Sequence, residues 1–380
     1  MEYRNYKNTD VKTSLLGLGC MRLPRTGRGH EIDYEKAEEI IDYAYNNGIN
    51  YYDSAYVYNG GESEKVMGKA LSKYPRESYM LATKLPNIRM SSPEVIREAF
   101  AEQCERCCTD YIDFYLMHNL NEGSFETFMQ PHVIETLLEL KAEGKIKRLG
   151  FSSHAELETL RKFVEYGAGR FDFAQIQLNY LDWEYQDAKG QYELLAENGI
   201  PVVVMEPVRG GRLASITPEA DKMLQDFAPG KSIASWGIRY AASLPNIQVV
   251  LSGMSNMEQI IDNVETISNF QPVSEEEIRL LTTAGNMLLG LTQVPCTACR
   301  YCVDDCPSSL QIPDLLAIYN SWNLSKSFFD LMPIIEGPEE ERPDQCVACR
   351  ECVGHCPQNI EIPDALEALA KALEQMPPRR

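Results

Sequence analysis

Residues 34–53, YEKAEEIIDYAYNNGINYYD, contain one repeat of the pattern that decides the fold. Apolar residues recur there at helical spacing, at Ala37, Ile40, Ile41 and Ala44. This predicts an amphipathic helix over 34–47, and Gly48 provides the left-handed residue that commonly follows such a helix. Residues 49–53 are short and mostly apolar, which predicts a buried strand directly after the helix.

The same alternation of helix and strand continues along most of the chain. Short apolar runs predict eight strands, at residues 15–20, 49–53, 79–84, 111–118, 146–152, 173–179, 201–206 and 248–253. Ser92-Pro93-Glu94 and Thr217-Pro218-Glu219 are typical helix starts between them. Eight βα units in series favour a closed α/β barrel, the (β/α)8 or TIM barrel, over an open sheet. We expect this barrel to occupy residues 1–288.

Composition limits the partners of this chain of 380 residues. Its formal net charge of −20 argues against nucleic acid or an anionic membrane surface, and favours small neutral substrates or basic protein patches. The polar first ten residues lack the apolar core of a signal peptide, and no apolar run reaches the roughly 18 residues that span a bilayer. We therefore expect a cytoplasmic protein.

Polar residues stand where the predicted strands end, which is the edge at which barrel enzymes place their chemistry. They are Asp53, Lys84, His118, Ser152, Gln177, Asn179, Glu206 and the pair Ser252-Gly253. Any one of these could be an ordinary hydrogen-bonded polar group. Together they predict a functional site at the carboxyl ends of the strands.

Three segments that contain some of these polar residues resemble the active-site segments of the aldo-keto reductase family. They are Asp53-Ser54-Ala55-Tyr56-Val57-Tyr58, Ala82-Thr83-Lys84 and Leu116-Met117-His118, and further similar segments extend the resemblance over roughly residues 3–290. The resemblance implies a carbonyl reductase in which Asp53, Tyr58, Lys84 and His118 are catalytic.

The chemistry of these residue types fits that role, because carbonyl reduction needs a proton donor at the oxygen. Tyr58 would be the donor, with Tyr56 as the nearest alternative. A free phenol has a pKa of about 10, so we expect the ammonium of Lys84 to make Tyr58 more acidic. Asp53 would hold Lys84 in place, and His118 would hydrogen-bond the carbonyl oxygen.

The resemblance also implies a nicotinamide cofactor. Ser152, Ser153 and Gln177 would bind the carboxamide, although the family more often has Asn where Ser153 stands. Met205 aligns with the aromatic residue that commonly covers the ring. The remaining cofactor contacts would be Gly253, Ser255, Gln259 and Asn263. This last segment offers no cation for a 2′-phosphate, so NADH, NADPH or use of both stays open. Nothing in the sequence identifies a flavin, which is a further option.

Eight cysteines near the C-terminus form two copies of the bacterial ferredoxin motif, each followed by proline. In such motifs three thiolates bind one [4Fe–4S] cluster and the fourth binds the other cluster. One set is therefore Cys296, Cys299, Cys302 and Cys356, and the other is Cys346, Cys349, Cys352 and Cys306. Zinc sites or a disulfide framework are the alternatives.

The repeat extends past the cysteines into QIPDLL at 311–316 and EIPDAL at 361–366, where proline begins a helix. Residues 289–380 thus resemble a small, mainly helical dicluster ferredoxin domain. The other cysteines, Cys20, Cys104, Cys107 and Cys108, are expected to be packing residues. His30, His132, His154 and His355 are expected near the surface or behind the site, with His154 the nearest to substrate.

These observations lead to one function and two alternatives. The leading hypothesis is an oxidoreductase that moves electrons between a small carbonyl or alcohol, a nicotinamide, and two [4Fe–4S] clusters that serve the barrel or an electron-transfer protein. The second is a carbonyl reductase whose clusters are structural or sense oxygen. The third is a redox-responsive binding protein that keeps its cofactor without turnover.

Overall fold

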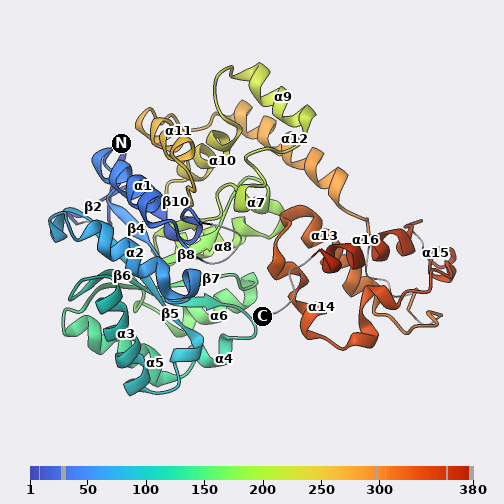
Figure 1. Ribbon diagram of the computed structural model, residues 1–380, viewed down its shortest axis with the longest axis horizontal. Coiled ribbons are helices and arrows are strands. Elements are labelled where there is room, and N and C mark those ends of the chain that lie inside the picture. Colours follow the sequence, from blue (N-terminus) through green and yellow to red (C-terminus); the bar gives the residue numbers. More distant parts are fainter. Residues whose placement is uncertain are drawn as a thin grey trace. The chain divides into compact units, whose positions relative to one another are not determined.

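The computed structural model describes residues 1–7, 9–26, 31–296, 298, 300, 302–303, 305–356 and 358–375. The chain divides into two compact units (Figure 1). The first comprises residues 1–214 and 224–282, and the second comprises residues 215–223 and 283–380. The expected domain boundary between residues 288 and 289 stays a prediction.

The first unit contains a closed barrel of eight parallel strands. In sequence order these are β3 (Leu16–Gly19), β4 (Tyr51–Asp53), β5 (Met80–Pro86), β6 (Ile112–Leu120), β7 (Ile146–Ser153), β8 (Phe173–Gln177), β9 (Val202–Met205) and β10 (Ile247–Ser252). Each neighbour in sequence pairs with the next, and β10 pairs with β3 to close the barrel. Every predicted strand overlaps one of these eight, which confirms the (β/α)8 fold.

Helices alternate with the strands along the chain (Figure 1). The larger ones are α1 (Tyr34–Asn46), α2 (Glu62–Leu71), α3 (Pro93–Arg106), α5 (Pro131–Ala142), α6 (Leu157–Tyr166), α8 (Ala188–Glu197), α9 (Pro218–Phe227), α10 (Ile233–Ala242), α11 (Met257–Ser268) and α12 (Glu275–Thr292), and the single turns are α4 (Phe125–Phe128) and α7 (Asp182–Tyr185). Gly48 has a φ of 89° just after α1, as its position predicted. The Ser92 side chain accepts from the backbone N–H of Val95 and caps α3.

A short antiparallel hairpin precedes the barrel, formed by β1 (Tyr3–Asn5) and β2 (Lys12–Ser14). The buried Tyr6 between these strands belongs to the same core cluster as Tyr51, Phe114 and Phe173 of the barrel. Its ring meets that of Phe114 edge-on, with 5.6 Å between centroids. The hairpin is an unpredicted feature, because strands of three residues are too short to show an alternating pattern in the sequence.

The second unit holds the helices of the C-terminal region. These are α13 (Ile312–Ser325), α14 (Met332–Glu336), α15 (Glu351–Gly354) and α16 (Ile362–Glu374). Pro313 and Pro363 lie in the first turns of α13 and α16, as the repeated tails predicted. The two long helices share one apolar core, which includes Leu310, Leu316, Ile360, Leu366 and Leu369.

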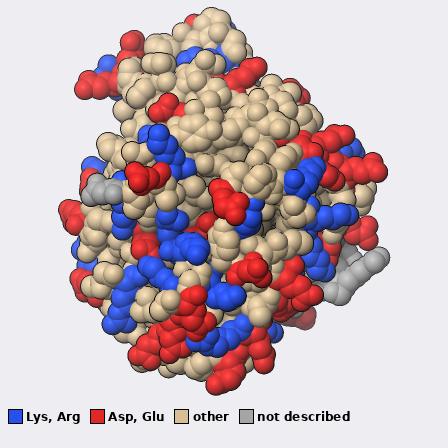
Figure 2. Space-filling view, turned by 90° about the vertical axis from the view of Figure 1, so that its left-hand side faces the viewer, with Lys and Arg blue, Asp and Glu red and all other residues tan. Residues whose placement is uncertain are grey.

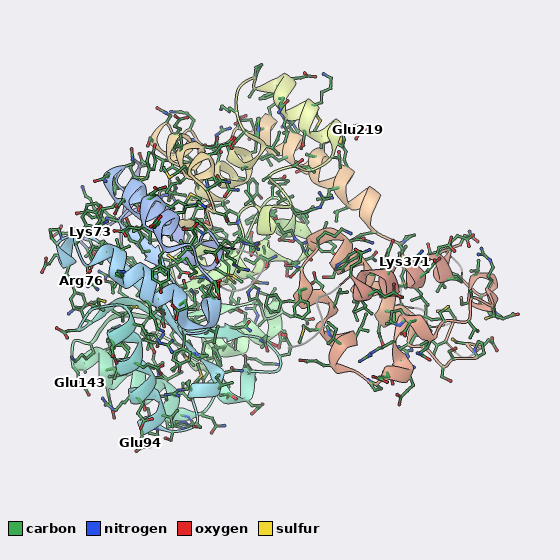
Figure 3. All side chains as sticks on the ribbon, viewed as in Figure 1. Lys73, Arg76, Glu94, Glu143, Glu219 and Lys371 are labelled. Carbon is green, nitrogen blue, oxygen red and sulfur yellow. The ribbon has the colours of Figure 1, made fainter. Side chains whose placement is uncertain are left out.

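Charged side chains of both signs are interspersed over the face shown in Figure 2. Several form local pairs at the edge of the barrel unit, where Figure 3 labels Lys73 and Arg76. Lys73 bridges Glu38 and Asp42 at 2.6 and 2.7 Å, and Arg76 lies 2.7 Å from Asp113. Within the described residues, no helix combines the length and apolar character needed to cross a membrane.

One glycine in α2 allows close packing against the end of α3 and can be tested. A Cβ at Gly68 would lie 2.5 Å from the backbone carbon of Cys107 and 2.6 Å from the carbonyl oxygen of Arg106. Because backbone atoms cannot rotate away, we expect Gly68→Ala to lower the free energy of unfolding of the barrel by about 1–3 kcal/mol, despite the better helix propensity of alanine. Urea unfolding followed by circular dichroism measures this.

Gly123→Ala is the control in the same unit. A Cβ there meets only the side-chain Oδ1 of Asn121, at 3.3 Å, so the change should stay within about 0.5 kcal/mol. Equal losses for both variants would contradict the proposed packing role of Gly68.

Candidate functional site

The polar residues predicted for the barrel edge do lie at the carboxyl ends of the strands. Asp53 ends β4, Lys84 lies near the end of β5, His118 near the end of β6 and Ser152 near the end of β7. Parallel pairing places these ends along one edge of the barrel, with Asp53 opposite Ala82 and Met117 opposite Phe151. The structure therefore brings together residues that are up to 99 positions apart in the chain, from Asp53 to Ser152.

Asp53 and Lys84 form a buried ion pair. The Lys84 Nζ lies 2.6 Å from Asp53 Oδ1, and the two side chains are 0% and 4% exposed. Lys84 also donates to the carbonyl oxygen of Ser54. Burial raises the pKa of Asp53, against the opposing effect of Lys84. Burial alone would lower the pKa of Lys84, yet Asp53 and Tyr58 raise it, so the ammonium stays charged.

Tyr58 and His118 lie beside this pair. The Lys84 Nζ is 4.8 Å from the centroid of the Tyr58 ring, and the rings of Tyr58 and His118 meet edge-on at 5.8 Å. Burial lowers the pKa of His118 to about 3, and the Lys84 ammonium contributes in the same direction. His118 is therefore neutral at physiological pH. Tyr56, the alternative phenol, points elsewhere and donates to Glu102 at 2.8 Å.

The expected acidification of Tyr58 is wrong as a net effect. Lys84 does lower the pKa of Tyr58, but burial raises it by more, so the phenol is less acidic than free tyrosine. Moving a phenolate out of water has a free-energy cost that exceeds the stabilisation it gains from the Lys84 ammonium. Asp53 weakens that stabilisation because it neutralises the same ammonium. The phenol therefore keeps its proton at neutral pH, which is the state that a proton donor requires.

A buried network behind Lys84 was not predicted. Glu64 is fully buried and accepts from Thr83, from Gln103 at 2.7 Å and from Arg106 at 3.1 Å. Gln103 also donates to the carbonyl oxygen of Lys84 at 3.0 Å. This network fixes the backbone that carries Lys84. A glutamate inside a helix gives no local signal of burial, so only the tertiary structure reveals its role.

The residues predicted to bind the nicotinamide lie along the next strands. Ser152 and Ser153 are buried in β7, and their hydroxyl oxygens accept from Asn119 N–H and Ala155 N–H at 2.9 and 3.1 Å. Gln177 at the end of β8 donates to Asp182 at 2.8 Å, and Met205 faces it across the β8–β9 pair. These side chains line one arc of the same edge.

The segment after β10 is held together by its own contacts. The Gln259 side chain accepts from Ser255 N–H at 2.7 Å, and Asn263 donates to Ser252 at 2.8 Å. Gly253 is exposed. Ser255, Gln259 and Asn263 thus shape this loop, and their role as direct cofactor contacts stays a prediction.

Arg22, which the sequence analysis missed, provides a cation at this place. A Cβ on Gly253 would lie 3.1 Å from Arg22 Cβ, so the arginine packs directly on the end of β10. The Ser255 hydroxyl donates to the carbonyl oxygen of Arg22 at 2.7 Å. The guanidinium of Arg22 lies 3.9 Å from the Glu206 carboxylate. Arg22 follows the first strand, far from the segment after the eighth, and only barrel closure brings the two together.

The loop after β9 carries an unusual concentration of left-handed backbone. Glu206, Arg209, Gly210 and Gly211 have φ values of 58°, 47°, 64° and 99°. Arg209 is buried against Asp182 at 3.0 Å, and its Nη1 has no hydrogen-bond partner among the described atoms. Asp53 Oδ2 is similarly unpaired. Strained backbone and unpaired buried polar groups mark ligand sites, so the residues present fit a bound polar cofactor at this edge.

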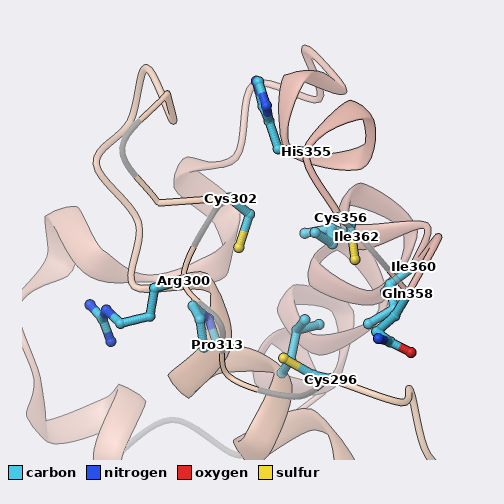
Figure 4. Close-up of a pocket in the computed structure, with 10 residues that line it drawn as sticks. Cys296, Arg300, Cys302, Pro313, His355, Cys356, Gln358, Ile360 and Ile362 are labelled. Carbon is cyan, nitrogen blue, oxygen red and sulfur yellow. The ribbon is translucent and has the colours of Figure 1, made fainter.

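In the second unit, cysteines from both copies of the motif line one cavity. Figure 4 shows the sulfur atoms of Cys296, Cys302 and Cys356 turned toward it. Cys299, which was predicted to complete this set, lies outside the described residues, as does Pro357. The walls between the sulfurs are largely apolar, with Pro313, Leu316 and Ile362.

A second cavity brings together Cys346, Cys349, Cys352 and Cys306. This is the other predicted set, with its fourth cysteine again taken from the opposite copy. Four thiol sulfurs around an apolar cavity fit the ligand requirement of a [4Fe–4S] cluster. Among the described cysteines, which exclude Cys299, none is joined in a disulfide.

The remaining cysteines and histidines are placed as follows. Cys20 and Cys107 are buried packing residues and Cys104 is half-buried, whereas Cys108 is exposed, so the expectation that it packs is wrong. Cys108 follows the C-cap of α3 with a left-handed backbone, at a φ of 52°. His132 bonds to the Met90 carbonyl, His154 is exposed near His118, and His355 lines the first cysteine cavity. His30 lies outside the described residues.

Comparison with solved structures relates the barrel to known enzymes. Aldo-keto reductase AKR11C1 from Bacillus halodurans in its holo form is 29% identical, with a TM-score of 0.62, over 75% of this chain and 96% of that one. A thermostable aldo-keto reductase, Tm1743, shares the fold at 22% identity and a TM-score of 0.62, over 75% of this chain and 100% of that one.

Sequence relatives agree with the structural ones. The NADH-specific methylglyoxal reductase of Escherichia coli is 28% identical, with 68% of this chain and 91% of that protein covered. The L-galactose dehydrogenase of Arabidopsis thaliana is 26% identical, with 73% and 91% covered. Residues 295–361 match the family model of the 4Fe-4S dicluster domain, and residues 15–286 match that of the aldo/keto reductase family. The chain is therefore an oxidoreductase that belongs to the aldo/keto reductase family and carries a C-terminal dicluster domain.

Proposed function

We propose that the barrel reduces a small carbonyl compound, or oxidises the corresponding alcohol, with NAD(P)H. We further propose that the C-terminal domain holds two [4Fe–4S] clusters that exchange electrons with the barrel or with a protein partner. The observation that carries the barrel assignment is the buried Asp53–Lys84 pair beside Tyr58 and His118. When bound, the reduced nicotinamide supplies hydride, and the clusters supply single electrons.

The four barrel residues have distinct tasks in this proposal. Tyr58 gives its proton to the substrate oxygen as negative charge develops there. Lys84 stabilises the phenolate that remains, and Asp53 keeps Lys84 charged and in position. Neutral His118 donates a hydrogen bond to the same oxygen and orients the carbonyl.

The cofactor contacts follow the arc from β7 to β10. Ser152, Ser153 and Gln177 would hold the carboxamide, and Met205 would cover the ring face. Arg22 adds the cation that the segment after β10 lacks, and it would face a phosphate of the dinucleotide. The choice between NADH and NADPH then depends on whether Arg22 reaches a 2′-phosphate. The similarity to an NADH-specific reductase favours activity with NADH.

The catalytic assignment is tested by comparing two tyrosines. Tyr58→Phe removes the proposed proton donor and should lower kcat for methylglyoxal reduction by about 10²-fold or more. Tyr56→Phe removes a hydroxyl of the same kind that bonds to Glu102, and it should keep near wild-type kcat. Steady-state oxidation of NADH or NADPH measures both. Unchanged kcat in Tyr58→Phe, with any carbonyl that is turned over, would exclude this residue as the acid.

The pH dependence follows from the two shifted groups. The pKa of His118 is about 3 and burial raises that of Tyr58 above its ordinary value, so neither group changes protonation between roughly pH 5 and 9. We expect kcat/KM for carbonyl reduction to be flat across this range and to fall only at more alkaline pH, where Tyr58 loses its proton. Initial rates over that range, with circular dichroism to confirm folding, test this. An inflection near pH 6.5 would show that His118 titrates as a free imidazole.

The cluster assignment is tested by anaerobic purification. Two clusters require about eight iron and eight sulfide per chain, whereas zinc or an iron-free chain would contradict the proposal. Mass spectrometry of released nucleotide identifies the dinucleotide.

Stopped-flow mixing of dithionite-reduced protein with NAD(P)⁺ or carbonyl then separates the hypotheses on the role of the clusters. Reoxidation of the clusters at the rate of turnover supports electron exchange with the barrel. Clusters that stay reduced favour the hypothesis that they are structural or sense oxygen.

A further inference from the structure

Gln177, the last residue of β8, faces the mouth of the barrel. Residues two apart in a strand share a face, and β8 pairs with β9 in unbroken register over residues 174–177. Phe173 of β8 lies in the barrel core, so Gln177, four residues on, points to the same interior. Lys84 in β5 stands in the same relation to the core residue Ala82. Gln177 and Lys84 therefore face the same mouth.

The amide of Gln177 has one orientation that its surroundings permit. Its Nε2 lies 2.8 Å from Asp182 Oδ2 and 2.9 Å from Gln186 Oε1. A carboxylate has no proton to donate, so the atom of Gln177 that faces Asp182 must be the nitrogen. Gln186 imposes no such choice, because its own amide can turn to offer either end. The Oε1 of Gln177 has no hydrogen-bond partner among the described residues, so Gln177 presents an acceptor to the mouth.

Asp182 is itself held firmly. Asp182 and Arg209 are 0% and 5% exposed, and the Arg209 Nε lies 3.0 Å from Oδ1 and 3.2 Å from Oδ2 of the carboxylate. Asn179 Nδ2 donates to the same Oδ2 at 2.6 Å. The Asn179 amide is fixed in turn, because its Oδ1 accepts from the backbone N–H groups of Leu181 and Asp182 at 3.0 and 2.9 Å. Asp182 cannot rotate without breaking these contacts.

The same contacts reach the loop after β9. Asn179 Nδ2 also donates to the carbonyl oxygen of Glu206 at 3.0 Å, and Arg209 belongs to this loop. Glu206 and Arg209 have left-handed φ values, which persist in residues other than glycine only where the surroundings hold them. Met205, which we expect to cover the nicotinamide ring, directly precedes Glu206. The Asp182–Arg209 pair thus joins the end of β8 to the segment beside Met205.

A nicotinamide carboxamide has two different ends, a carbonyl oxygen that accepts and an NH2 group that donates. Gln177 with its oxygen free can bind only the NH2 end. Ser152 suits the other end, because its Oγ accepts from Asn119 N–H at 2.9 Å and its own proton is unused within the described part of the chain. A carboxamide bound at both ends has one orientation, so the ring presents one face to the substrate.

We propose that the buried Asp182–Arg209 pair positions the cofactor by fixing Gln177 so that its Oε1 accepts from the carboxamide NH2. This inference rests on the proposed use of a nicotinamide cofactor and adds to it two positioning residues. Asp182 and Arg209 act through Gln177 and not by contact with the carboxamide. The consequence is discrimination against a ring substituent that cannot donate a hydrogen bond.

The test compares two dinucleotides that differ in one group. NAD⁺ carries a carboxamide, whereas 3-acetylpyridine adenine dinucleotide has a methyl group in place of the NH2 and can only accept. Isothermal titration calorimetry of the anaerobically purified full-length protein gives the ratio of their dissociation constants, with the 2′-phosphorylated pair as a second set. We expect the wild-type protein to bind the carboxamide form about two- to tenfold more tightly, which is the contribution of one hydrogen bond.

Two variants remove the proposed discrimination in different ways. Asp182→Leu combined with Arg209→Met replaces the pair by apolar residues and leaves no buried charge unpaired, so folding should be retained. Gln177 can then turn either end to the ligand, and the ratio should fall to near one. Any phosphate contact of Arg209 is common to both dinucleotides and cancels in the ratio. Gln177→Met leaves the pair intact and removes the acceptor, so its ratio should also be near one.

The matched control removes another buried ion pair of the same unit. Arg239 and Glu277 pair at 2.9 Å, are 6% and 11% exposed, and make no contact with Gln177 among the described residues. Arg239→Met combined with Glu277→Leu should keep the wild-type ratio, with circular dichroism to confirm folding. The inference is overturned by a wild-type protein that does not discriminate, by either variant keeping the wild-type ratio, or by a control that loses it. A wild-type protein that binds neither pair of dinucleotides would instead contradict the proposed function.

Discussion

The barrel site depends on one buried ion pair. Lys84 has no exposed surface, and an isolated ammonium there would be strongly destabilised. Asp53 stabilises the charge at 2.6 Å, and the carbonyl oxygen of Ser54 accepts a second hydrogen bond from the ammonium. The pair places positive charge next to the Tyr58 ring while the phenol stays protonated. The proposed acid catalysis requires a charged group close to a protonated donor, and this arrangement provides both.

The barrel positions Asp53, Lys84 and His118 by supplying each from a different strand end, whereas Tyr58 begins the 3-10 turn Tyr58–Gly61 that follows β4. Asp53 and Lys84 come from neighbouring strands, and His118 from the next one. Behind them Gln103 of α3 donates to the carbonyl oxygen of Lys84 and to the carboxylate of Glu64 in α2. A rigid scaffold with its functional groups at one edge lets the loops vary without moving the reactive groups.

Much of this could be predicted from the sequence, for reasons that differ by feature. The eight strands are short, mostly apolar runs, and the cysteine motifs have a spacing that few other sites share. The hairpin strands are too short to show a period, and Arg22 reaches the cofactor edge only through closure of β10 on β3. The raised pKa of Tyr58 results from the balance between burial and two opposing charges, which a sequence does not show. Exposure of Cys108 likewise depends on how α3 ends.

The exchange of one cysteine between the two loops has a structural consequence. Cys356 completes the cavity of the first copy, and Cys306 completes that of the second. Each half of the repeat therefore lacks one wall when taken alone, and a chain broken between α13 and α16 would lose both cavities together.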